Sequence, residues 1–202
     1  MKFLKHKVLI SSVIFAALVL PLALQAQVDR EALKQYNQER IDYNKSGMLI
    51  LGSWAVGNIA TGAVMAERTS GETKAFHQMN VYWNSVNLLI AGFGYFSAMR
   101  EVPEDDLWAT ISAQNSIEKV LLVNAGLDVA YIAAGLWLNE RGMRLDDEQF
   151  QGFGKSIMLQ GAFLMSFDLI KYFVHNKHSK GLGKIVDQVN LTGNGLSLRW
   201  EF

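Results

Sequence analysis

The chain has 202 residues, of which 50% are hydrophobic and only 19% are charged. Its 19 basic and 19 acidic residues cancel, so no excess charge indicates nucleic acid or an acidic substrate as a partner. Cysteine is absent, which excludes disulfides, thiolate metal sites and cysteine nucleophiles. The low charged share and the two prolines favour long apolar helices.

Residues 1–26 have the pattern of a secretory signal. Lys2, Lys5 and Lys7 precede an apolar run over residues 8–24, and the small residue Ala26 ends it. We predict a signal peptide cleaved after Ala26, with an uncleaved anchor helix as the alternative. In both cases residue 27 starts on the outer side of a membrane. Residues 27–47 are polar with a thin apolar stripe, which predicts an amphipathic helix on the membrane or bundle surface.

Four apolar segments follow the polar stretch, at residues 48–66, 81–99, 120–138 and 156–174. Each is close to the roughly 20 residues that cross a bilayer core. The first two carry no charge, the third carries only Asp128, and the fourth carries only Asp168 and Lys171. A soluble bundle would show a charged face on every helix. We therefore predict an all-α membrane protein, a four-transmembrane-helix bundle built from two helical hairpins, over a soluble helical domain.

The connecting segments differ in charge, which predicts an orientation. Residues 67–80 and 139–155 hold basic residues, whereas residues 100–119 are mainly acidic. Basic connections favour the cytoplasmic side, so we expect a bacterial inner-membrane protein with both termini in the periplasm. Basic residues in the tail, Lys177, Lys180 and Lys184, point the other way. The pair Glu67-Arg68 after the first segment recurs as Glu140-Arg141 after the third, which supports two similar hairpins.

The tail over residues 175–202 changes character towards its end. Apolar residues alternate with polar ones at Leu196, Leu198, Trp200 and Phe202, after a Gly-Asn-Gly sequence. This two-residue period predicts a short C-terminal β-hairpin.

Polar residues within the four segments are the candidate site. At helical spacing His77, Asn80, Asn84 and Asn87 share one face of the second segment. With a rise of about 1.5 Å per helical residue, polar residues of all four segments are expected at depths near the middle of the membrane. Such groups normally face the bundle interior. The candidates for a polar core, or for a ligand or ion site, are Asn58, His77, Asn80, Asn84, Asn87, Asn124, Asp128, Tyr131 and Gln160.

Asp128 is the most informative of these residues. Its carboxyl group would either bind a proton or cation on a transport path, or form hydrogen bonds that make helix packing specific. Asp168 and Lys171 are three residues apart, which predicts an ion pair within one helix. His77 lies before the second segment, about a membrane thickness from His175 and His178, which argues against a shared haem or metal. We predict no catalytic residues, no metal and no cofactor.

The run Phe76-His77-Gln78-Met79-Asn80, with Trp83, Asn84 and Asn87 after it, follows Gly52-Ser53-Trp54-Ala55-Val56-Gly57-Asn58. In these features the chain resembles a family of small uncharacterised bacterial membrane proteins with about four transmembrane helices. The resemblance spans roughly residues 45–175 and implies an envelope protein of unknown function, without catalytic residues.

These observations favour a non-enzymatic protein with a structural or interaction role in the bacterial envelope. The alternative is a small transporter or channel with a proton or cation site at Asp128. We expect membrane lipid as a partner and no nucleic acid, and the small volume that four short helices enclose favours a homo-oligomer.

Overall fold

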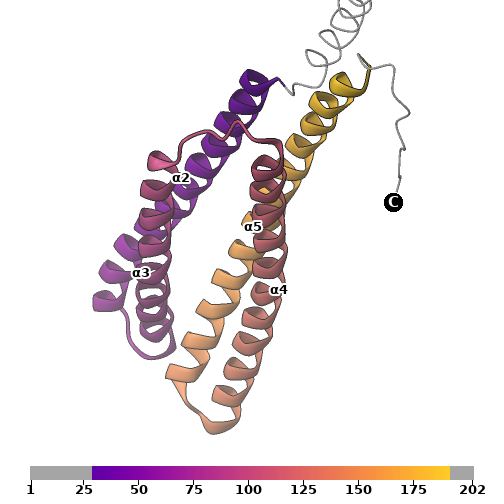
Figure 1. Cartoon of the computed structure of the whole chain (residues 1–202). Coiled ribbons are helices and arrows are strands. Elements are labelled where there is room, and N and C mark those ends of the chain that lie inside the picture. The colour runs from indigo at the N-terminus through magenta and orange to yellow at the C-terminus, as the bar shows by residue number, and fades with distance from the viewer. Residues whose placement is uncertain (1–28, 192–202) are drawn as a thin grey trace, which may run out of the picture.

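The computed structural model describes residues 29–191, and every regular element among them is an α-helix (Figure 1). This confirms the all-α, four-helix part of the prediction. The predicted signal or anchor segment, residues 1–26, lies outside the described residues. The helices are α2 (Arg30–Arg68), α3 (Gly71–Arg100), α4 (Leu107–Leu145) and α5 (Glu148–Leu191).

The helices are much longer than the predicted membrane segments. Helix α2 has 39 residues, so it is about 58 Å long, nearly twice the roughly 30 Å of a bilayer core. The predicted surface helix and the first predicted membrane segment, which meet at residue 47, form one continuous helix in α2. The polar half of α2 buries Leu33 and Tyr36 against Leu182 of α5, and this contact holds the helix in the bundle.

Two short turns lie at one end of the bundle and one longer connection lies at the other (Figure 1). Thr69 and Ser70 join α2 to α3, and residues 146–147 join α4 to α5. Asp146 ends α4 in the left-handed conformation with φ 54°, and Asp147 Oδ1 accepts a hydrogen bond from the Phe150 amide. Residues 101–106 connect the two hairpins, and Asp106 caps α4 by accepting from the Ala109 amide.

Helix α5 is the central helix of the arrangement. Helices α2 and α3 pack as one hairpin and α4 and α5 as the other, while α5 also contacts both α3 and α2. Along residues 29–191, the backbones of α3 and α4 do not approach each other. The bundle is therefore open between α3 and α4, at the level of the backbone.

Polar and apolar residues are arranged as in a membrane protein. On α3, Asn84 is fully buried, whereas Leu89 and Phe93 are 62% and 75% exposed. Helices α2, α4 and α5 are long and apolar enough to cross a membrane. Helix α3 does not reach that level, since its buried amides lower the hydropathy of the helix. The sequence expectation of four spanning helices is thus supported for three of them.

The predicted C-terminal β-hairpin is not supported. Its first half, residues 185–191, continues helix α5 to Leu191, and the alternating residues after position 195 lie outside the described part of the chain. Leu182 is buried against α2 and Ile185 packs beside it, so apolar contacts one turn apart favour a helix there.

Candidate functional site

A cluster of hydrogen-bonded side chains, the amide cluster, joins α2, α3 and α5. It comprises Trp54, Asn58, Asn80, Ser156 and Gln160. Gln160 is fully buried, accepts from Trp54 Nε1 at 2.9 Å and donates to Asn80 Oδ1 at 2.9 Å. It also donates to Asn58 Oδ1 at 3.4 Å, and Ser156 donates to Asn80 Oδ1 at 2.7 Å. Because the polar atoms find partners here, the cluster specifies how the helices pack.

The predicted polar stripe on α3 is buried from Asn80 to Asn87. Asn84 donates to the Asn80 carbonyl at 2.9 Å, and Asn87 donates to Asn84 Oδ1 at 3.4 Å. His77 lies apart from these bonds, edge-on to Phe76, and its Nδ1 is buried without a partner among the described residues. The stripe therefore continues the amide cluster along α3 as far as Asn87.

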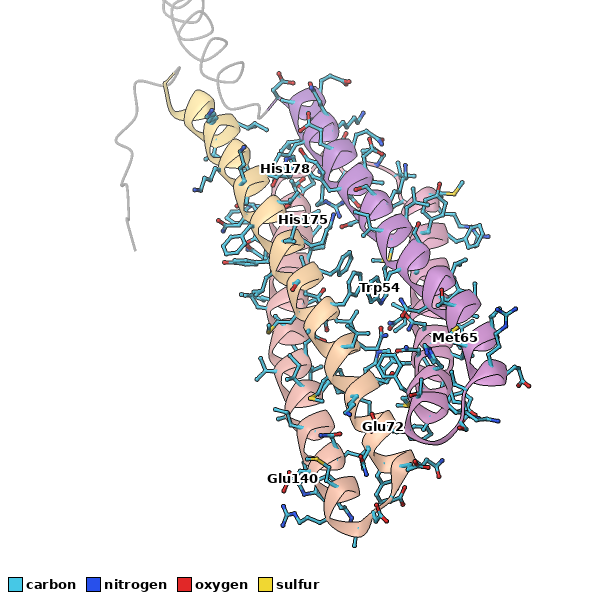
Figure 2. The ribbon with its side chains drawn as sticks, turned by 180° about the vertical axis from the view of Figure 1, so that it is seen from behind. Trp54, Met65, Glu72, Glu140, His175 and His178 are labelled. Carbon is cyan, nitrogen blue, oxygen red and sulfur yellow. The ribbon has the colours of Figure 1, made fainter. Side chains whose placement is uncertain are left out.

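His77 and the two C-terminal histidines lie towards opposite ends of the bundle. Figure 2 shows His175 and His178 in the C-terminal half of α5, with Glu72 of α3, five residues before His77, towards the opposite end of the bundle. Across residues 29–191, no three His, Asp or Glu side chains gather closely enough to hold a metal ion.

A cavity of about 650 Å³, which we call the groove, lies between α3 and α4. Its floor comes from α2 and α5. The polar residues that line it include Asn87, Asn124, Asp128, Asp168, Lys171 and His175. Apolar residues form most of its wall, among them Met48, Leu51, Val86, Ile90, Val120 and Phe167. This combination of an apolar wall with a few convergent polar groups is typical of a ligand-binding pocket.

Two acidic side chains meet in the groove, one from α4 and one from α5. Asp128 is 3% exposed and Asp168 is 6% exposed, and their carboxyl groups are within hydrogen-bonding reach of each other. Asn124 lines the same groove. Asp128 Oδ2 has no hydrogen-bond partner among the described residues. We call Asp128 and Asp168 the carboxyl pair; unlike the amide cluster, it is incompletely satisfied.

The predicted ion pair between Asp168 and Lys171 does not appear among the salt bridges of residues 29–191. Lys171 Nζ donates instead to the backbone carbonyl of Tyr43 on α2. Gly47 makes this approach possible, because a Cβ there would lie only 2.9 Å from Lys171 Cε. Side chains three residues apart on α5 thus point to different neighbours, Asp168 towards α4 and Lys171 towards α2.

Buried polar residues close the end of the groove near His175. His175 is fully buried, and neither of its ring nitrogens has a partner in the described part of the chain. Its backbone carbonyl accepts from Gln114 Nε2 at 2.9 Å, which ties α5 to α4. Beyond it, Arg40 is buried and donates to Asn37 and to Glu101 of the longer connection. These contacts close the bundle at this end and leave His175 facing the groove.

His178 and Tyr36 stack one turn further along, outside the membrane segments of the prediction. Their ring centroids are 4.0 Å apart, and His178 Nε2 lies 3.1 Å from the Tyr36 carbonyl. Burial lowers the pKa of His178, although Glu39 lies 3.6 Å from its Nδ1. Burial also raises the pKa of Tyr36. Both rings are therefore neutral around pH 7, and the Glu39 contact is not an ion pair.

The polar residues that the sequence grouped in one core divide in the structure between the amide cluster and the groove, and Asn87 belongs to both the α3 stripe and the groove lining. Asn58, Asn80 and Gln160 belong to the amide cluster, whereas Asn124 and Asp128 line the groove. Tyr131 contributes its ring to the groove wall, perpendicular to Trp83 with centroids 5.0 Å apart.

Sequence reasoning missed that three residues of α5 line the same groove. Asp168, Lys171 and His175 recur at spacings of three and four, the pattern of one helix face. That spacing is the signal that would have identified them. It also missed Trp54 and Ser156 of the amide cluster, for which the sequence offers no comparable signal.

The comparisons with known proteins identify a family and no activity. Residues 50–169 match the model of DUF6992, a family of unknown function. This agrees with the resemblance to an uncharacterised family. The matched range holds the carboxyl pair and the amide cluster, and it ends before Lys171. Neither the curated proteins nor the solved structures gave a match.

Proposed function

The chain belongs to the family of unknown function DUF6992, and we propose that it is a membrane protein that takes up and releases a proton at the carboxyl pair, as part of a small transporter. The observation that carries this proposal is the contact between two buried carboxyl groups in a large cavity. No enzymatic activity is proposed.

Adjacent carboxylates in an apolar environment repel each other and lose hydration. One of the two is therefore protonated, or a cation lies between them. We favour a shared proton over a metal ion, because within residues 29–191 no third His, Asp or Glu side chain joins the pair to complete a metal site. The unpartnered Asp128 Oδ2 leaves one position where a proton can arrive or depart without breaking a hydrogen bond.

Lys171 balances the charge of the pair. With one proton shared, the pair carries a charge of −1 and Lys171 carries +1, which leaves the groove neutral. Loss or gain of a proton would give a buried net charge, which is costly in a membrane. The carboxyl pair thus holds its proton until another group compensates for the loss.

The test combines infrared spectroscopy with proton flux in liposomes. We expect a protonated carboxylic-acid band that Asp128→Asn removes, together with lost flux and unchanged folded yield. Asp42→Asn is the matched control, because Asp42 is an exposed carboxylate on α2 whose hydrogen bonds within residues 29–191 are those from the Gln38 and Lys45 side chains. Flux that persists in Asp128→Asn would overturn the proposal.

A second candidate is a structural or interaction role in the bacterial envelope. The amide cluster favours it, because a satisfied network across three helices makes a rigid scaffold for lipid or for a second copy of the chain. Lost folded yield in Asp128→Asn, without any proton flux in the unaltered protein, would favour this role over transport.

We further propose a bacterial inner-membrane location with both termini in the periplasm. The two short turns share one end of the bundle (Figure 1), and basic residues such as Arg68 and Arg144 lie there. Reporters fused after Glu72 and Glu104 test the orientation. Cytoplasmic activity at Glu104 would refute it.

A further inference from the structure

We propose that the groove binds a lipophilic monovalent cation, which enters from the bilayer and displaces the proton shared by the carboxyl pair. This inference rests on the proposed function, since it requires that proton. It adds the chemical class of the ligand, the entry route and an exchange of one positive charge for another.

The entry route follows from the helix arrangement. Helices α3 and α4 have no backbone contact within the described residues, so the groove is bounded there only by side chains. Val86 and Ile90 on α3 and Val120 on α4 line the groove, yet each is more than half exposed. In a bilayer this opening faces lipid, so a molecule that partitions into the membrane reaches the groove without crossing water.

The volume and the wall suit an organic ion. A cavity of about 650 Å³ falls within the range that holds drug-sized molecules. Trp83 of α3 and Tyr131 of α4 line the groove with perpendicular rings, and Phe167 lines it from α5. Aromatic faces attract cations, most strongly where water is excluded.

The charges of the groove select a cation over an anion. Its titratable or charged residues are Asp128 and Tyr131 on α4 and Asp168, Lys171 and His175 on α5; α2 and α3 contribute none to its lining. His175 is buried near Lys171, and a second positive charge there is unfavourable, so we take its ring as neutral. Lys171 is held at the Tyr43 carbonyl, which leaves the two carboxyl groups facing the groove.

The exchange balances in charge. Before binding, the singly protonated pair and Lys171 sum to zero. A monovalent cation enters, the shared proton leaves to water, and the doubly ionised pair, Lys171 and the ligand again sum to zero. For an anion the charges balance only if the pair takes up a second proton, and the positive Lys171 is held at the Tyr43 carbonyl instead of facing the ligand.

The experiment compares two ions of nearly equal size and opposite charge, tetraphenylphosphonium and tetraphenylborate. The full chain is placed in zwitterionic lipid nanodiscs, and binding heats are measured in two buffers of different ionisation enthalpy, with empty nanodiscs subtracted. We expect tetraphenylphosphonium to bind and to release about one proton per cation. In the pH range in which the pair is singly protonated, the affinity for tetraphenylphosphonium should fall about tenfold for each unit by which the pH decreases.

Variants link the binding to the carboxyl pair. Asp128→Asn and Asp168→Asn should each abolish proton release on binding, whereas the control Asp42→Asn should retain it. Should either variant fail to fold, the proton count and the pH dependence of the unaltered protein still test the inference.

The outcomes separate this inference from the proposed function. Equal binding of tetraphenylborate would overturn the cation selectivity, and binding without proton release would overturn the exchange. A protonated carboxyl band without tetraphenylphosphonium binding would refute the inference and leave the proposed function intact. Absence of both the band and the binding would refute the two together.

Discussion

The close contact of α4 and α5 depends on Gly135 and Gly154, and replacing Gly154 with alanine tests it. A Cβ at Gly154 would lie 2.5 Å from the Asn139 amide nitrogen and 2.6 Å from the Gly135 carbonyl oxygen. Both are backbone atoms of a helix, so neither can rotate away. The helices have to separate, and overpacking of this kind costs about 1–3 kcal/mol.

Alanine also stabilises a helix relative to glycine by about 1 kcal/mol, which offsets part of that cost. Since the clash involves backbone, we take the upper part of the range and expect a net loss of about 1–2 kcal/mol for Gly154→Ala. Gly126, also on α4, is the matched control, because a Cβ there meets nothing within 4 Å. Gly126→Ala should therefore stabilise the protein by up to about 1 kcal/mol.

The assay is thermal unfolding in detergent, followed by tryptophan fluorescence. The two variants should differ by about 1–3 kcal/mol, which corresponds to roughly 2–12 °C in Tm for a chain of this size. Equal Tm values for Gly154→Ala and Gly126→Ala would refute the close packing of α4 on α5 at this position.

Three further predictions use the same unfolding assay. Gln160→Leu leaves Trp54 Nε1 without its acceptor and should lower the free energy of unfolding by about 1–3 kcal/mol. Ser156→Ala should lower it less, because Asn80 Oδ1 still accepts a hydrogen bond from Gln160. Equal losses in the two variants would contradict this. Gly47→Ala should displace the flexible Lys171 ammonium from the Tyr43 carbonyl and lower the free energy of unfolding by about 0.5–2 kcal/mol. The same substitution should have no such effect in a Lys171→Met background. Burial lowers the pKa of His178, so stability should be complete above the usual histidine pKa of about 6.5 and fall as the unfolded state takes up protons below it. His178→Gln should reduce this loss of Tm on acidification; an unchanged pH profile would argue against it.

The sequence predicted the helices well and their ends poorly. The apolar segments were visible because charge is absent from them, and the turns were expected between them. The helix ends were missed because polar residues beyond the segments keep their helical conformation through distant contacts, such as that of Arg40 with Glu101. Such contacts join residues far apart in the chain, and local periodicity carries no information about them.

Depth along a helix was predictable, but the direction of each side chain around the bundle was not. Counting residues brought Asn58 and Gln160 to the depth of Asn87 and Asp128, whereas in the structure Asn58 and Gln160 lie with Asn80 and Asp128 lies in the groove. The order of helices around the axis separates the two sets: α5 contacts both α3 and α4, while α3 and α4 stay apart within the described chain. Asp128 therefore meets Asp168 rather than the amides of α3.

The central position of α5 has a consequence for biosynthesis. Gln160 lies 106 residues after its partner Trp54, so the ribosome needs roughly 5–20 s to add the residues between them. During that interval the first hairpin is complete, but the indole of Trp54 and the amide of Asn80 still lack the partners that α5 supplies. A nascent chain that stops after α4 would keep these groups without their α5 partners, so assembly of the native bundle depends on the last helix that the structure describes.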